Sequence, residues 1–144
     1  MAITRDIVAA LGGRRVIGRE VDDAKALLKR IRLGLPYASY EHVAHLLEAS
    51  LDEVGQVLNL PTRTRARRKR EKRLEPDESD RLVRVARILA TAGNVLGSPD
   101  KAARWLRRPN RALGGEVPLH LLDTEVGEQL VEDVLGRLEH GVLS

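Results

Sequence analysis

Cysteine and phenylalanine are absent from this sequence of 144 residues, and only one tryptophan and two tyrosines occur in it. The lack of cysteine excludes a disulfide framework, a thiolate zinc site and a cysteine nucleophile, and it is typical of cytosolic proteins. Because aromatic rings are scarce, the core must be built from Leu, Val, Ile and Ala, which favours helices. No apolar run is long enough to cross a bilayer, and residues 1–12 lack a continuous hydrophobic signal. We therefore expect a cytoplasmic protein that does not enter a membrane.

The small net charge of +4 hides a strong separation of charge along the chain. Residues 62–73 hold six Arg and two Lys against the single acid Glu71, a local charge of +7 that leaves −3 for all other residues. From Glu116 to the C-terminus, seven acids stand against Arg137, a net charge of −6. The basic segment is therefore suited to a polyanion such as nucleic acid, whereas the C-terminal region would repel one.

Apolar residues recur at helical spacing through most of the chain, and stop signals fall between the periodic segments. This pattern predicts an all-α fold. The expected helices cover residues 7–11, 23–33, 40–47, 51–58, 62–72, 77–96, 99–108, 118–122 and 125–140. The expected caps are Asp22 or Asp23, Ser50, Ser98 and Thr124, with Glu53 completing a capping box after Ser50. Residues 16–21 are compatible with either a loop or a short extended piece.

The last predicted helix carries a stripe of apolar residues four positions apart. Val126, Leu130, Val134 and Leu138 make up this stripe, which we expect to face the core. The stripe predicts that the helix packs on the rest of the chain through these four side chains.

The short helix 51–58 is separated from the basic helix by Asn59, Leu60 and Pro61, which interrupt helical structure. Two short helices joined by about three residues, the second rich in Arg, are the arrangement of a helix-turn-helix. Its first turns offer Arg for guanine edges and Thr or Lys for phosphates. The candidate DNA-binding residues are Thr62, Arg63, Thr64, Arg65, Arg67, Arg68 and Lys69.

Two other interpretations of the basic helix are compatible with its composition. A charge run is usually a solvated helix or linker, but the capped short helix and the turn before this one favour DNA contact. RNA is a second polyanion, although the scarcity of aromatic stacking residues weighs against single-stranded RNA. Arg65 stands about where a helix-turn-helix normally carries an apolar anchor, so the geometry of the helix is expected to depart from the usual one.

Few residues suggest catalysis or metal binding. His42 and His45 lie one turn apart, but no third ligand with a fixed position accompanies them, and they are interpreted as surface residues. Ser79 beside Asp80 lacks a nucleophile elbow, and the pair Gly114–Gly115 lacks the spacing of a phosphate loop. We expect no enzyme, no cofactor and no metal.

An ordered set of residues fills the second half of the chain. It comprises Ala103, Trp105, Leu106, Pro109, Asn110, Ala112, Leu113, Gly114, Gly115, Pro118, Leu119, Leu122, Thr124, Gly127, Arg137, Glu139, His140 and Gly141. In this order the residues resemble the Xre, MbcA and ParS family of antitoxins, which pair with RES-domain toxins. The chain from the Gly34, Leu35, Pro36 turn onward is similar to that family, with Arg65 as a departure within the helix-turn-helix.

The resemblance implies a helical dimerisation and DNA-binding region over residues 1–76, followed by a small helical toxin-binding domain over residues 77–144. It also implies a homodimer that binds operator DNA, represses its own operon and neutralises a RES-domain toxin that depletes NAD. In this family the C-terminal residues block the NAD pocket of the toxin. The toxin-binding residues expected on this basis are Trp105, Arg137, Glu139, His140, Gly141, Val142, Leu143 and Ser144.

Other functions remain compatible with the residues alone. A stand-alone helix-turn-helix transcriptional regulator would use its C-terminal domain only to dimerise or to sense a ligand. A helical enzyme is disfavoured, because no catalytic constellation is present. By itself Trp105 is more typical of a core anchor, and the C-terminal residues are more typical of a frayed end. An adjacent reading frame for a RES-like protein would favour the antitoxin over the regulator.

Overall fold

The computed structural model describes residues 2–141, and within them every regular element is a helix. The prediction of an all-α fold is therefore confirmed. The α-helices are α1 (Ala2–Ala10), α2 (Arg14–Ile17), α3 (Ala24–Leu33), α4 (Tyr37–Leu47), α5 (Leu51–Val57), α6 (Thr62–Glu71), α7 (Pro76–Leu96), α8 (Pro99–Leu106) and α9 (Glu125–Glu139). Two 3₁₀ helices, η1 (Arg111–Leu113) and η2 (Pro118–Asp123), lie between α8 and α9.

The caps predicted from the sequence begin the helices as expected. The side chains of Asp23, Ser50, Ser98 and Thr124 each accept a hydrogen bond from a backbone N–H in the first turn of α3, α5, α8 and α9. Such bonds satisfy donors that would otherwise lack a partner at a helix start. Glu53 differs from the prediction, because its carboxylate turns away from Ser50 and contacts Arg107 and His120.

The N-terminal region is more helical than the sequence predicted. Residues 14–17 form the short helix α2, where a loop or an extended piece was expected over 16–21. Ile17 on this turn is fully buried, and Gly13 and Gly18 flank it with positive φ angles of 76° and 110°. The burial of this apolar side chain between two glycines, which permit positive φ angles, therefore holds the turn in place. The turn is too short for the spacing of apolar residues to reveal it.

The long helix α7 forms the centre of the molecule and contacts α1, α3, α4, α8 and α9. Its buried residues include Leu82, Val85, Ile88 and Ala92, which spread over several turns. One hydrophobic core runs from Ile7 in α1 to Leu135 in α9 without a break at residue 76. The first and second halves of the chain are therefore packed on the same helix.

The face that α9 buries agrees with the predicted stripe at Val134 and Leu138 and differs from it at Val126 and Leu130. Val131, Val134 and Leu135 are buried, whereas Val126 and Leu130 are 68% and 49% exposed. A Cβ atom at Gly127 would overlap the backbone carbonyl of Leu121, so glycine permits α9 to approach η2 closely. The buried face thus starts at a glycine and includes Glu128, and neither residue contributes to an apolar pattern.

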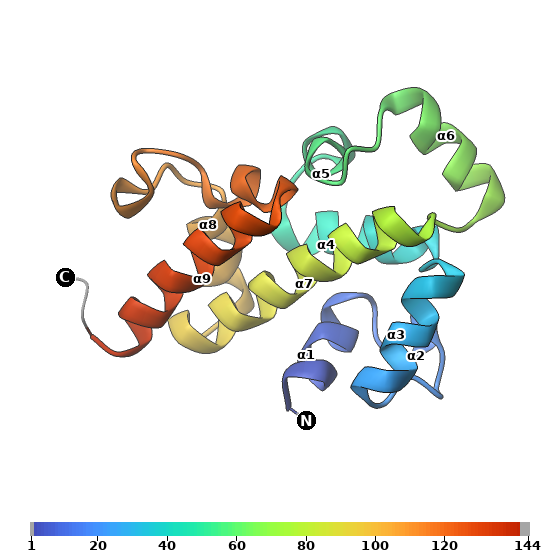
Figure 1. The fold of residues 1–144 in the computed structure, drawn as a ribbon, viewed down its shortest axis with the longest axis horizontal. Coiled ribbons are helices and arrows are strands. Elements are labelled where there is room, and N and C mark those ends of the chain that lie inside the picture. The colour runs from blue at the N-terminus through green and yellow to red at the C-terminus, as the bar shows by residue number, and fades with distance from the viewer. Residues whose placement is uncertain (1, 142–144) are drawn as a thin grey trace.

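The arrangement in space places the two charged segments far apart. Figure 1 shows α6 at one end of the long axis, while the C-terminal end of α9 lies toward the other end. The central helix α7 runs between them. A partner at α6 and a partner at the end of α9 would therefore meet different surfaces of the protein.

Candidate functional site

The turn between α5 and α6 takes the form expected of a helix-turn-helix. Asn59 adopts a left-handed conformation with φ of 56°, and Pro61 is the residue that precedes the first turn of α6. Leu58 and Leu60 on either side of Asn59 are buried. The buried leucines fix the turn on the core, and the left-handed residue redirects the chain into the basic helix.

The basic helix α6 has no buried apolar side chain. Its one apolar residue, Ala66, is exposed, and Arg68 is its only buried residue. Hydrophobic contacts between α6 and the rest of the protein are therefore nearly absent, although such contacts supply most of the stability of helices in proteins. Polar contacts must hold α6 in place.

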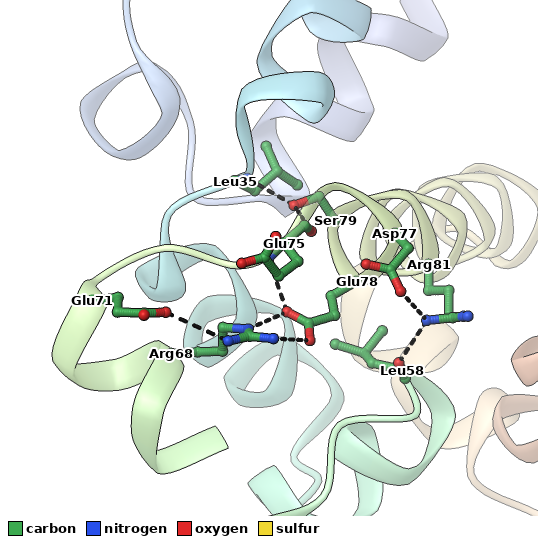
Figure 2. Close-up of polar contacts among 9 residues, drawn as sticks. All are labelled: Leu35, Leu58, Arg68, Glu71, Glu75, Asp77, Glu78, Ser79 and Arg81. Carbon is green, nitrogen blue, oxygen red and sulfur yellow. Dashed lines mark hydrogen bonds and ion pairs between the residues drawn. The ribbon is translucent and has the colours of Figure 1, made fainter. Parts of the chain in front are cut away.

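Arg68 makes the strongest of these contacts, with Glu78 on α7. The Nε and Nη2 atoms of Arg68 donate hydrogen bonds to the two carboxylate oxygens of Glu78, at 2.7 Å and 3.0 Å, as Figure 2 shows. Arg68 is 8% exposed and Glu78 is 5% exposed. Glu71 accepts a further bond from Arg68 at 3.4 Å. A forked ion pair shielded from water in this way fixes both the position and the orientation of the helix.

The Glu78 carboxylate also organises the chain between α6 and α7. Its Oε1 atom accepts a hydrogen bond from the backbone N–H of Glu75, which completes a capping box at the start of α7. Beside it, the Ser79 hydroxyl donates to the carbonyl of Glu75 and accepts from the N–H of Leu35 (Figure 2). One cluster of side chains therefore joins the end of α3, the end of α6 and the start of α7.

Backbone contacts reinforce the same junction. The N–H of Leu74 donates to the carbonyl of Leu35, and the N–H of Tyr37 donates to the carbonyl of Lys72. A Cβ atom at Gly34 would overlap the carbonyl of Leu74, so this close approach requires glycine. The C-terminal end of α6 is therefore held to the turn between α3 and α4.

Arg65 holds the first half of α6. Its Nη1 atom lies 2.6 Å from the Oδ1 atom of Asp52 on α5, and its side chain is 17% exposed. The guanidinium also lies beside the phenol of Tyr40 and lowers its pKa, but burial is the larger effect and raises the pKa of Tyr40 to about 12. Arg65 thus performs through ion pairing the anchoring role that an apolar residue usually has at this position.

The seven predicted DNA-binding residues fall into two groups in the structure. Thr62, Arg63, Arg67 and Lys69 are exposed, and Thr64 is half-buried. Arg65 and Arg68 are held in ion pairs with Asp52 and Glu78 within the protein, and contact with DNA stays a prediction for all seven residues. Arg70, Lys72 and Arg73 add further exposed positive charge.

The residues predicted to bind a toxin occupy two places. Trp105 on α8 is partly buried against the core and lines a shallow surface pocket with Lys101, Arg104 and Arg108. Arg137, Glu139, His140 and Gly141 are exposed at the C-terminal end of α9. The predictions for Val142, Leu143 and Ser144 lie outside the described residues. Among the described residues, none from α9 lines the pocket beside Trp105.

Ion pairs join α9 to the central helix. Glu128 is 4% exposed and accepts hydrogen bonds from Arg87 on α7, with Arg84 3.5 Å away. The pKa of the neighbouring Glu132 is raised above its usual value. Burial is the main cause, and the negative charge of Glu128 is the second. The orientation of α9 is therefore set by charge pairing as well as by its apolar face.

A second cluster joins the helix-turn-helix to the C-terminal region. Glu53 on α5 accepts a hydrogen bond from Arg107 at 2.7 Å and lies 2.9 Å from the His120 ring. Partial burial tends to raise the pKa of Glu53, but the hydrogen bonds from His120 and Arg107 outweigh it and lower the pKa below its usual value. Asp52 and Glu53 are neighbours, so α5 contacts α6 with one carboxylate and the C-terminal region with the next.

Sequence reasoning missed the partners of the anchoring arginines. Nothing in the local pattern distinguishes Asp52 or Glu78 from solvated acids at the starts of helices.

Among residues 2–141, no group of three or more potential metal ligands lies together. None of the helices in this part of the chain is long and apolar enough to span a membrane.

Sequence models of two known protein domains match the two halves of the chain. Residues 26–87 match the sequence model of the antitoxin Xre-like helix-turn-helix domain. Residues 91–141 match that of the antitoxin Xre/MbcA/ParS C-terminal toxin-binding domain. The two matched regions meet within α7 and together include α6, Trp105 and α9.

Relatives of similar length carry the corresponding name. Antitoxin Xre of Yersinia enterocolitica is 32% identical over 132 residues, which cover 90% of this chain and 89% of the relative. Antitoxin Xre of Photorhabdus laumondii is 31% identical over the same shares. A protein of Sphingobium named Prs ADP-ribosylating antitoxin is 24% identical over 79% of this chain and 78% of its own length. The chain therefore belongs to the Xre family of antitoxins and is the antitoxin of a toxin-antitoxin system, with a helix-turn-helix domain and a C-terminal toxin-binding domain.

Proposed function

We propose that this antitoxin neutralises a RES-domain toxin that degrades NAD, and that it represses its own operon as a homodimer by binding operator DNA through α6. The observation that carries this proposal is that one small protein combines two features at separate places. One is an exposed arginine-rich helix, and the other is a region that matches the sequence model of a toxin-binding domain. Each feature alone would suit many proteins. Together they give one chain two partners of opposite charge preference.

The DNA contact rests on the exposed side chains at the start of α6. Arg63 and Arg67 are one turn apart and both exposed, so they can reach base edges or phosphates in a major groove. Thr62 and Lys69 extend this surface along the helix. Because Arg65 and Arg68 are occupied by Asp52 and Glu78, the helix keeps its position while the other arginines contact DNA.

The toxin contact is assigned to the end of α9 and the residues after it. Arg137, Glu139, His140 and Gly141 are exposed there, and the C-terminal residues follow directly. The segment from Glu116 onward has a net charge of −6, which complements the positive charge expected in a pocket that binds the phosphates of NAD. We assign inhibition to this group of residues: those after α9 would occupy the pocket in place of the dinucleotide, and Arg137 within α9 would contact the toxin beside the pocket.

The test is deletion of residues 140–144, with the toxin encoded beside this chain co-expressed. The truncated antitoxin is expected to keep its thermal stability and its operator binding while cellular NAD falls. The matched control is Arg63→Ala with Arg67→Ala, which should lose operator binding and still preserve NAD. If NAD remains high with the truncated chain, the C-terminal residues are not the inhibitory element.

A further inference from the structure

Two apolar side chains stand out on the surface of the matched toxin-binding domain. Val126 is 68% exposed and Leu130 is 49% exposed, and they lie one turn apart on α9. Elsewhere in this region large apolar residues such as Leu106, Leu122 and Leu135 are fully buried. Most surface apolar residues occur singly, so an adjacent exposed pair on one helix face indicates a contact surface.

We propose that the outer face of α9, formed by Val126, Leu130, Asp133 and Arg137, is the surface on which the toxin docks. This inference rests on the proposed function and adds a site to it, because docking on the helix is distinct from blockage of the pocket by the residues that follow. At about 100° per residue, these four side chains lie on one side of α9. The opposite side faces the core through Val131 and Leu135.

The continuity of this face with the C-terminal end identifies the occupant. Leu130 is nine residues before Glu139, so the apolar pair lies about 14 Å or more from the end of the helix at 1.5 Å per residue. Arg137 lies between them on the same face. A toxin whose pocket receives the C-terminal residues would therefore rest on this face, with an apolar patch about 14 Å from the pocket entrance.

The charges around the pair define the chemistry of the partner. Asp133 lies on the same side of α9 as the pair and is exposed, and the exposed Glu125 directly precedes Val126. Arg137 is the basic residue of the face. A complementary partner presents an apolar depression with basic residues on its rim, which is the usual layout of a protein interface with a dry centre and a polar border.

The chain offers a matched control on its other half. Leu28 and Leu33 on α3 are 45% and 60% exposed, but Lys25, Lys29 and Arg32 surround them. A partner with a basic rim would be repelled there. Leu28 and Leu33 are about 140° apart around α3, so they do not form one face. They therefore control for the effect of exposed apolar side chains in general, in a basic setting.

The experiment measures the affinity of the full-length chain for the RES-domain toxin encoded beside it, by calorimetry or biolayer interferometry. Val126→Ala with Leu130→Ala is expected to weaken binding about thirty-fold, the effect of losing one strong interface anchor. The melting temperature should remain that of the wild type, because both positions are exposed. Leu28→Ala with Leu33→Ala should bind the toxin with wild-type affinity.

Deletion of residues 140–144 distinguishes the docking site from the proposed inhibition. The truncated chain is expected to bind the toxin through α9 and to leave it active. If the Val126 and Leu130 variant binds as tightly as the wild type while the truncated chain does not bind, docking on α9 is wrong and inhibition by the C-terminal residues stands. The alternative outcome is that the Val126 and Leu130 variant loses self-association while its affinity for the toxin is unchanged. That result would assign the face to contact with a second copy of the chain and would overturn the proposal. If the wild-type chain does not bind a RES-domain toxin at all, the proposed function fails and the inference fails with it.

Discussion

The helices α6 and α9 are both exposed on one side and both held by ion pairs, yet only α9 is also held by buried apolar side chains. α6 has no buried apolar residue and is anchored by Arg65 and Arg68 in ion pairs. α9 packs through Val131 and Leu135 and exposes Val126 and Leu130 on its other face. The helix assigned to DNA is therefore charged on both faces, whereas the helix assigned to the toxin combines apolar packing with the buried carboxylate of Glu128 on one face and exposes two apolar side chains on the other.

The difference shows how one residue type can serve two purposes. Arginine provides the exposed surface of α6 at Arg63 and Arg67 and its anchors at Arg65 and Arg68. Ion pairs of buried arginine need a specific acid at a specific place, whereas apolar packing accepts many side chains of suitable volume. The position of α6 thus depends on Asp52 and Glu78, which lie on the neighbouring helices α5 and α7.

The largest effect is expected from removal of the anchor at the end of α6. Glu78→Ala leaves the buried guanidinium of Arg68 without its partner, which should lower the free energy of unfolding by about 3 to 5 kcal/mol. Urea denaturation measures this loss. Replacement of the pair by Arg68→Met with Glu78→Leu should recover most of it, because no uncompensated charge remains. A loss below about 1 kcal/mol for Glu78→Ala would show that the pair does not anchor α6.

Truncation of the apolar anchor of α9 gives the next effect. Leu135→Ala removes a fully buried side chain and should lower the free energy of unfolding by about 3 kcal/mol. Operator binding at a temperature well below the transition should remain, because Leu135 belongs to α9, which extends away from α6 (Figure 1). Reduced operator affinity with a folded C-terminal domain would contradict the separation of the two surfaces.

A smaller effect distinguishes an exposed arginine from an anchoring one. Arg63→Ala should weaken operator binding roughly ten-fold and reduce the salt slope by about one unit if a phosphate contact is lost. The melting temperature should not change. Arg65→Ala should lower both the melting temperature and the operator affinity, because the contact with Asp52 is lost. Equal behaviour of the two variants in both measurements would contradict the division of roles along α6.

The smallest effect concerns pH and the link between the two halves. The pKa of Glu53 is lowered in the folded protein, because the bonds from His120 and Arg107 outweigh its partial burial. Its contribution to stability is therefore present above the usual pKa of Glu and is lost as the pH falls through the lowered value. Denaturation measured between neutral pH and about pH 3 should show a smaller loss of stability in Glu53→Gln than in the wild type. Identical pH profiles for the variant and the wild type would show that Glu53 does not contribute to the pH dependence of stability.

Local signals in the sequence predicted the helices well and the tertiary contacts poorly. The caps Asp23, Ser50, Ser98 and Thr124 act within three residues, so they were found at their positions. The partners of Arg65 and Arg68 lie on other helices, and no local pattern identifies them. The prediction for α9 was right at Val134 and Leu138 and wrong at Val126 and Leu130, because Gly127 and Glu128 occupy buried positions that an apolar stripe cannot reveal.

The central claim is that the DNA surface and the toxin surface are separate, so both partners can bind one antitoxin assembly. Sedimentation of a labelled operator duplex with the antitoxin and its toxin tests this most directly. The account predicts one species that contains DNA, antitoxin and toxin together. Release of the antitoxin from the duplex upon addition of an equal amount of toxin would contradict it, because the two surfaces would then exclude each other.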